Sequence, residues 1–157
     1  MIYIKRITDI AILSTLLVVV DYVLAYIPNV QLVMLLMFLY VRNYKFSDVL
    51  IIITVYVVID NMMYGGLGMY TIPMLVGWFV VAFTLRCWRS SCEVTTLALL
   101  SILTSILYAI PFAIMNWILY GTIYAYIIAD IPFVIVMCVS SYLSIILLYE
   151  RIDRRIK

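Results

Sequence analysis

The sequence predicts an all-α membrane protein, a compact bundle of six transmembrane helices with both termini cytoplasmic. Composition is the first observation behind this prediction. Of 157 residues, 68% are hydrophobic and 11% are charged, and the mean hydropathy is +1.22. Soluble domains carry about 25% charged residues, and a soluble domain of this size cannot bury so much apolar surface. The composition therefore excludes a soluble enzyme, a nucleic-acid-binding protein and a disordered chain.

The spacing of the cations is the second observation. The ten Lys and Arg residues form four clusters, which leave three long stretches without a cation: 7–41, 46–85 and 90–150. One helical span needs about 20 residues, so each stretch fits two spans joined by a turn. Three hairpins place all four clusters on one face, and the positive-inside rule makes that face cytoplasmic. The clusters are Lys5–Arg6, Arg42–Lys45, Arg86–Arg89 and Arg151–Lys157.

Helix-breaking residues stand near the middle of each stretch, at Ile27-Pro28-Asn29, at Gly65-Gly66-Leu67-Gly68 and between Asn116 and Pro132. They divide the chain into six spans within one domain, 1–157. The second span is short for a bilayer. The predicted spans are 7–26, 30–41, 48–64, 71–85, 94–116 and 131–150.

Two helix starts rest on local signals. Ser47-Asp48 is typical of an N-cap for the third helix, and Asp130-Ile131-Pro132 is typical of an N-cap followed by proline in the first turn of the sixth. In that case residues 117–129 form a long outer connection. The alternative is one long sixth helix with a kink at Pro132.

Catalytic motifs are missing from the sequence. There is no histidine, which excludes Ser-His-Asp chemistry and imidazole ligation. The three cysteines form no CxxC pair, and Gly66-Leu67-Gly68 lacks the aspartate of a GxGD protease motif. No phosphate-binding loop is present, so the chain cannot hydrolyse ATP itself. We therefore expect no enzyme, no metal and no cofactor.

The acidic residues divide into two groups. Five accompany the cations and are interpreted as solvated interface charges: Asp9, Asp48, Glu93, Glu150 and Asp153. Asp21, Asp60 and Asp130 fall in the outer half, where no Lys or Arg is available. Asp130 is explained as well by a helix cap as by a binding role, and Asp60 is also explained by facing water. Asp21 is expected to face a polar cavity, because a carboxylate against lipid is costly.

Aromatic residues gather on the same outer side. An aromatic belt explains most of them, but tyrosines beside unpaired acids also suit a flat ligand that is neutral or cationic. An anionic ligand would find no cation there. The predicted substrate-binding residues are Asp21, Asn29, Asp60, Tyr64, Tyr70, Trp117, Tyr120, Tyr124 and Asp130.

Small residues recur along the fifth helix at Ser101, Ser105, Ala109 and Ala113. Such a ridge lets helices approach closely, either within the bundle or against a partner. Ala11 and Thr15 form a shorter version on the first helix.

Several strings resemble the substrate-binding (S) component of energy-coupling factor vitamin transporters. Residues 27–32 (IPNVQL) resemble the turn into that family's second helix, and residues 65–78 (GGLGMYTIPMLVGW) resemble its glycine-rich outer loop and fourth helix. Asp130-Ile131-Pro132-Phe133 and Ser140-Ser141 resemble its sixth helix. The resemblance covers nearly the whole chain through the order and spacing of these motifs.

The resemblance implies a high-affinity, multi-pass binding subunit of the cell membrane for a vitamin-like micronutrient. Its partners would be a membrane coupling subunit and two cytoplasmic ATPases. The family's Ala-x-x-x-Ala docking motif reads Ala11 to Thr15 here, so only the first alanine matches. The alternative is a small non-catalytic assembly subunit or a secondary transporter, although no inverted repeat is visible.

Overall fold

The computed structural model describes residues 2–26, 32–88 and 93–156, with side chains from residue 4 to residue 154 in these ranges. Six helices follow one another, and the described residues contain no strand, so the all-α prediction is confirmed. The helices are α1 (Ile2–Leu24), α2 (Val33–Asn43), α3 (Phe46–Met63), α4 (Thr71–Cys87), α5 (Val94–Tyr120) and α6 (Ile123–Ser144). A π-helical turn, η1 (Ile145–Tyr149), continues α6 into α7 (Glu150–Ile156).

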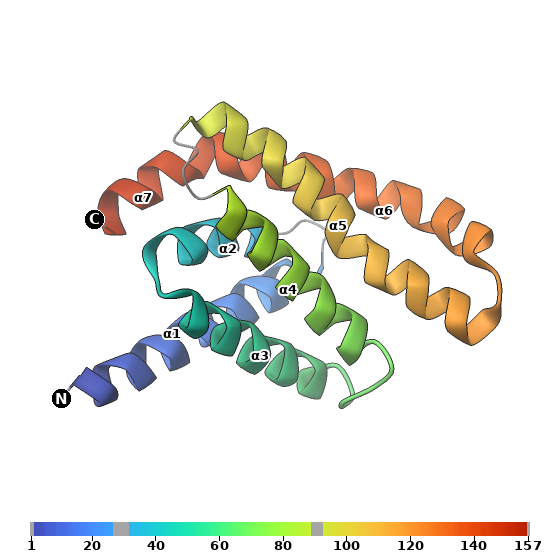
Figure 1. The fold of residues 1–157 in the computed structure, drawn as a ribbon, viewed down its shortest axis with the longest axis horizontal. Helices are drawn as coiled ribbons and strands as arrows, with labels where there is room; N and C mark the ends of the chain where they lie inside the picture. The colour runs from blue at the N-terminus through green and yellow to red at the C-terminus, as the bar shows by residue number, and fades with distance from the viewer. Residues whose placement is uncertain (1, 27–31, 89–92, 157) are drawn as a thin grey trace.

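Five of the helices pack in a row, α1–α3–α4–α5–α6, and α2 lies inside the bend of this row (Figure 1). The short helix α2 contacts α1, α3, α4, α6 and η1. Helices α5 and α6 form a long hairpin whose tip projects beyond the other helices (Figure 1). The bundle therefore has a core around α2 and a hairpin arm.

Helix α2 supplies the centre of the core because it is apolar around its whole circumference. Eight of its residues are buried, from Val33 to Val41. With 11 residues it is about 16 Å long, about half of a bilayer's hydrocarbon thickness. Protein rather than lipid surrounds it, so the bilayer does not set its length.

Four helices are long and apolar enough to cross a membrane: α1, α3, α5 and α6 with its continuation. Helix α4 has 17 residues and is about 25 Å long, at the short end for a span. These lengths and compositions make the chain a membrane protein.

The cation clusters meet at one end of the bundle, which we call the cation-rich end. Arg6 Nε donates to Asp48 Oδ1 at 2.9 Å, and Arg42 Nη1 donates to Tyr149 Oη at 3.3 Å. The guanidinium of Arg86 lies 4.9 Å from the ring centre of Phe46. The start of α1 and the end of α7 lie at this same side (Figure 1). We call the opposite end, where the cation-free stretches turn, the cation-free end.

The predicted start of the sixth helix at Asp130 is wrong, and the long sixth helix of the alternative is confirmed, while its kink at Pro132 stays a prediction. Helix α6 begins at Ile123, so Asp130 and Pro132 lie inside it and residues 117–129 are almost wholly helical. A non-helical connection of such apolar residues would expose unsatisfied backbone groups to lipid. Gly121, at φ 69°, ends α5 in the left-handed conformation that glycine adopts readily.

Two predictions at the cation-rich end also need correction. The N-cap of α3 is Lys45, without a side-chain cap, and Ser47-Asp48 lies in the first turn because Asp48 turns to Arg6. Asp153 is buried rather than solvated, and it accepts a hydrogen bond from Asn43 Nδ2 at 3.4 Å. The remaining boundaries differ from the predicted spans by a few residues in both directions: α1 begins and ends earlier than predicted, and α2 begins later.

Candidate functional site at the cation-free end

Asp21 on α1 and Asp60 on α3 form the centre of the cation-free end. Their carboxyl groups face one another closely enough to share a hydrogen bond. Tyr56, one turn before Asp60, donates its phenol O–H to Asp21 Oδ2 at 2.8 Å. Asp60 is only 7% exposed, so it does not face water. We call Asp21 and Asp60 the carboxyl pair.

The chemistry of the carboxyl pair follows from its surroundings. Two carboxylates in contact repel one another, and a hydrogen bond between them requires a proton on one of the two. No Lys or Arg stands in 7–41 or 46–85, the stretches that carry both residues. The pair can therefore hold a proton or attract a cationic group.

A row of aromatic rings leads away from the carboxyl pair. Successive ring centres are 6.1 Å apart from Tyr56 to Trp78, 4.7 Å from Trp78 to Tyr108, and 5.3 Å from Tyr108 to Phe112. Tyr70 stacks on Phe112 at 6.5 Å. This aromatic row crosses from α3 through α4 to α5, and it connects the carboxyl pair with the α5–α6 hairpin.

Trp78 is the most constrained member of the aromatic row. It is fully buried, and its indole N–H lies near the phenol of Tyr108 without completing a hydrogen bond. A buried donor without a partner destabilises the fold by about 1–3 kcal/mol.

Gly77 makes the contact between α4 and α5 possible. A Cβ at this position would lie 2.9 Å from Tyr108 Cδ2 and 3.0 Å from the Tyr108 carbonyl oxygen. The first distance is shorter than real Cβ contacts and the second is tight, so any other residue here would require Tyr108 to shift. Gly77 thus holds Tyr108 against Trp78.

The loop between α3 and α4 is closed by a polar network next to Asp60. Thr71 Oγ1 donates to Asn61 Oδ1 at 2.9 Å, and it accepts the backbone N–H of Gly68 at 3.1 Å. Gly65 and Gly66 have φ values of 116° and 105°, which side-chain-bearing residues rarely adopt. This loop fixes the cation-free end of α3.

Asp130 lies apart from the carboxyl pair, in a groove between α5 and α6. The groove has a volume of about 220 Å³, and we call it the Asp130 groove. Its walls include the rings of Tyr108, Phe112 and Tyr126. Tyr108 is within electrostatic range of both the carboxyl pair and Tyr126. The groove thus combines one carboxyl with three aromatic rings and touches the aromatic row.

The structure separates the predicted substrate-binding residues into three places. Asp21 and Asp60 form the carboxyl pair, with Tyr64 within electrostatic range of both. Asp130 lines its groove, and Tyr70 stacks on Phe112 near it. Three aromatics lie exposed around the hairpin tip, the most exposed at 80%: Trp117, Tyr120 and Tyr124. Asn29 lies outside the described residues.

The small-residue ridge of α5 packs within the bundle along its first half. Ser105 Oγ lies 3.3 Å from Ser141 Oγ of α6, and Ser101 is fully buried. Ala109 and Ala113 instead line grooves between α5 and α6. On α1, Ala11 and Thr15 are exposed, and the Thr15 hydroxyl donates to the Ala11 carbonyl at 2.8 Å. Their face is uncovered.

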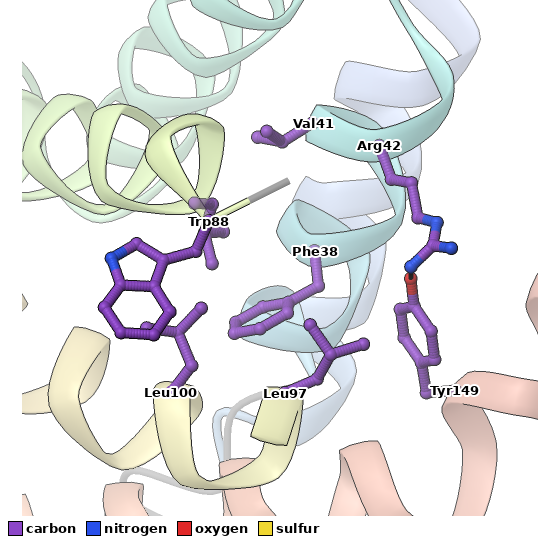
Figure 2. Close-up of a pocket in the computed structure, with 8 residues that line it drawn as sticks. Phe38, Val41, Arg42, Trp88, Leu97, Leu100 and Tyr149 are labelled. Atoms are coloured by element: carbon purple, nitrogen blue, oxygen red, sulfur yellow. Dashed lines mark hydrogen bonds between the residues drawn. The ribbon is translucent and has the colours of Figure 1, made fainter. Parts of the chain in front are cut away.

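A cavity at the cation-rich end is too small for a solute. Figure 2 shows Phe38, Leu97, Leu100 and Trp88 around it, with Arg42 donating to Tyr149 at its side. Its volume of about 20 Å³ holds about one water molecule.

Sequence reasoning did not single out Tyr56, Tyr108 or Phe112 as site residues. One signal was available for Tyr56, which stands four residues before Asp60 and so shares its helix face. Tyr108 and Phe112 sit in a uniformly apolar helix, where only the packing of α4 against α5 distinguishes them.

Comparisons with known protein families, curated proteins and solved structures find no match to this chain.

Proposed function

We propose that this protein is a membrane-embedded binding subunit for a small heteroaromatic solute that carries an amine or another cationic group. By its resemblance to S components, it serves a vitamin importer of the cell membrane as a multi-pass subunit. In this proposal it performs no catalysis, and a coupling subunit with two ATPases supplies the energy.

The Asp130 groove is the observation that carries the proposal. A carboxyl beside three aromatic rings is a typical arrangement for a flat cation, because the rings attract positive charge on their faces and the carboxylate holds an amine. Stretch 90–150, which supplies the whole groove, contains no Lys or Arg to hold an acidic ligand. A thiamine-type compound or an aminated deazapurine thus fits better than folate, biotin or pantothenate.

Ligand binding in the Asp130 groove can be followed through the aromatic row. A ligand in the groove touches Tyr108, and Tyr108 packs on the indole of Trp78. Binding is therefore expected to change the fluorescence of Trp78. The signal is expected to disappear in Trp78→Phe while the dissociation constant changes less than threefold.

Ligand binding to the purified protein tests the proposal. Thiamine and an aminated deazapurine are compared with biotin, folate and pantothenate by thermal shift and equilibrium binding. A binder at 100 times its dissociation constant stabilises the protein by about 2.7 kcal/mol. Asp130→Asn is expected to weaken binding at least tenfold, about 1.4 kcal/mol, because its carboxyl lines the groove. Asp21→Asn is expected to have a smaller effect, since Asp21 lies apart from the groove.

Glu93→Gln is the matched control, since Glu93 is an exposed acid at the cation-rich end. It is expected to bind as the parent protein does. Tight binding of an acidic vitamin that is unchanged in both Asp variants contradicts the proposal.

Docking to a coupling subunit is tested on the exposed face of α1. Ala11→Trp and Thr15→Trp are expected to abolish transport while ligand binding is retained, because bulky residues prevent close helix approach. Leu16→Trp is the control, since Leu16 is exposed and lies about 100° around α1 from Thr15 and about 140° from Ala11. Unchanged transport in both variants excludes this face as the docking surface.

The carboxyl pair favours a second candidate, a proton-coupled secondary transporter. Buried acids that can hold a proton are typical of such transporters. Uptake into liposomes that contain this protein alone distinguishes the two. A secondary transporter accumulates solute along a proton gradient and loses uptake with a protonophore, whereas a binding subunit shows no uptake without its ATPases.

A further inference from the structure

A groove at the cation-rich end lies between the start of α1 and the connection from α2 to α3. Its volume is about 310 Å³. Charged residues line part of it, with Lys5, Arg6 and Lys45 against Asp9 and Asp48, which leaves one net positive charge. No part of the proposed solute site lines this groove, which we call the lysine groove.

Two of its cations are available to a ligand. Arg6 is held by Asp48 through an Nε–Oδ1 hydrogen bond of 2.9 Å. Lys5 and Lys45 are exposed, and neither forms an ion pair with a described residue. Two ammonium groups on opposite walls of one groove favour an anion between them.

The residues that line the lysine groove change from charged to apolar along the chain on both sides. Ile10 and Leu13 follow Lys5 along α1, and Ile52 follows Lys45 along α3. From Lys5 to Leu13 the helix rises about 12 Å. A free phosphate ion gains nothing from this apolar part, whereas a phospholipid carries its phosphate directly above its acyl chains.

We propose that the lysine groove binds one anionic phospholipid, with its phosphate between Lys5 and Lys45 and an acyl chain along Ile10, Leu13 and Ile52. Basic pockets between transmembrane helices on the positively charged side bind anionic headgroups in this way. The proposal does not depend on the solute that the Asp130 groove takes.

Native mass spectrometry of the detergent-purified protein tests the proposal, with phosphatidylglycerol and phosphatidylcholine as competing lipids. We expect one retained phosphatidylglycerol per chain and at least a tenfold preference over phosphatidylcholine. Lys5→Gln with Lys45→Gln is expected to reduce that retention at least tenfold. Arg151→Gln with Arg154→Gln removes the same charge at the same end outside the groove, and is expected to leave retention within twofold.

Two further arms separate the lipid from other occupants. Ile10→Trp fills the apolar part and is expected to reduce lipid retention with both lysines present, while millimolar inorganic phosphate does not displace the lipid. Displacement by phosphate, equal retention of both lipids, or equal loss in the two double variants overturns the proposal. Loss of coupling-subunit binding in Lys5→Gln with Lys45→Gln, with lipid retention unchanged, assigns the groove to a protein and overturns it too.

Discussion

The two ends of the bundle use the same residue type in different ways. At the cation-rich end, Asp48 accepts from Arg6, and Glu150 lies 3.5 Å from Arg154. At the cation-free end, Asp21 and Asp60 meet each other and the phenol of Tyr56. Asp130 lies in a groove walled by aromatic rings.

This difference shows how the surroundings decide the role of a carboxyl group. An exposed acid beside a guanidinium contributes little to stability, since water and salt screen the pair. A carboxyl without a cation, in surroundings of low polarity, holds a proton and donates a hydrogen bond, or it attracts a ligand. We therefore expect the functional site at the cation-free end, whereas the charges of the cation-rich end set the orientation of the protein in the membrane.

Topology gives the largest expected contrast between the ends, since labelling is all or none. In a background without Cys87, Cys92 and Cys138, single cysteines at Leu67 and Tyr120 are expected to react with an impermeant thiol reagent added outside intact cells. A cysteine at Lys45 is expected to remain unlabelled, although all three positions are exposed. Outside labelling at Lys45 contradicts the proposed orientation.

Gly77→Ala changes only the cation-free end, at the contact between α4 and α5 that holds the aromatic row together. The added Cβ meets Tyr108 at 2.9 Å, and such overpacking costs about 1–3 kcal/mol of unfolding free energy. Gly68→Ala is the control, because its Cβ would meet no atom closer than 3.9 Å. Equal unfolding free energies of the two variants in detergent would show that the contact between α4 and α5 accommodates the added Cβ.

Removing one phenol hydroxyl at each end compares the two kinds of hydrogen bond. Tyr56→Phe removes the donor to Asp21 and is expected to cost about 1.5 kcal/mol of stability, because bonds to ionisable groups are stronger. Tyr40→Phe removes a 3.1 Å bond to the Leu13 carbonyl and is expected to cost about 1 kcal/mol. Reversal of this order in unfolding measurements argues against a special role for the carboxyl pair.

Arg6→Gln has a small expected effect, at most about 1 kcal/mol of stability, since surface ion pairs are weak. That effect is expected to vanish in about 1 M salt, where the screening length falls to about 3 Å. Arg154→Gln, at a more exposed pair, is expected to change nothing measurable. A loss for Arg6→Gln that persists in high salt indicates a structural role beyond the ion pair.

The sequence by itself determined the class of protein, the helix hairpins and the gathering of cations at one end. These follow from apolar runs whose length is set by a bilayer, and from charges that must stay near water. It also placed three acids at the end without cations. These features depend on how each residue interacts with water or lipid, so they can be predicted from each segment of the sequence separately.

Only the tertiary structure decided which of these acids meet. Asp21 and Asp60 are brought together by the packing of α1 against α3, while Asp130 stays on the α5–α6 arm. Local signals placed Asp130 at a helix start, but the backbone's need for hydrogen bonds in an apolar setting extended α6 past it. The aromatic row depends likewise on Gly77, because the fit between two helix surfaces is a property of both helices and appears in neither sequence segment alone.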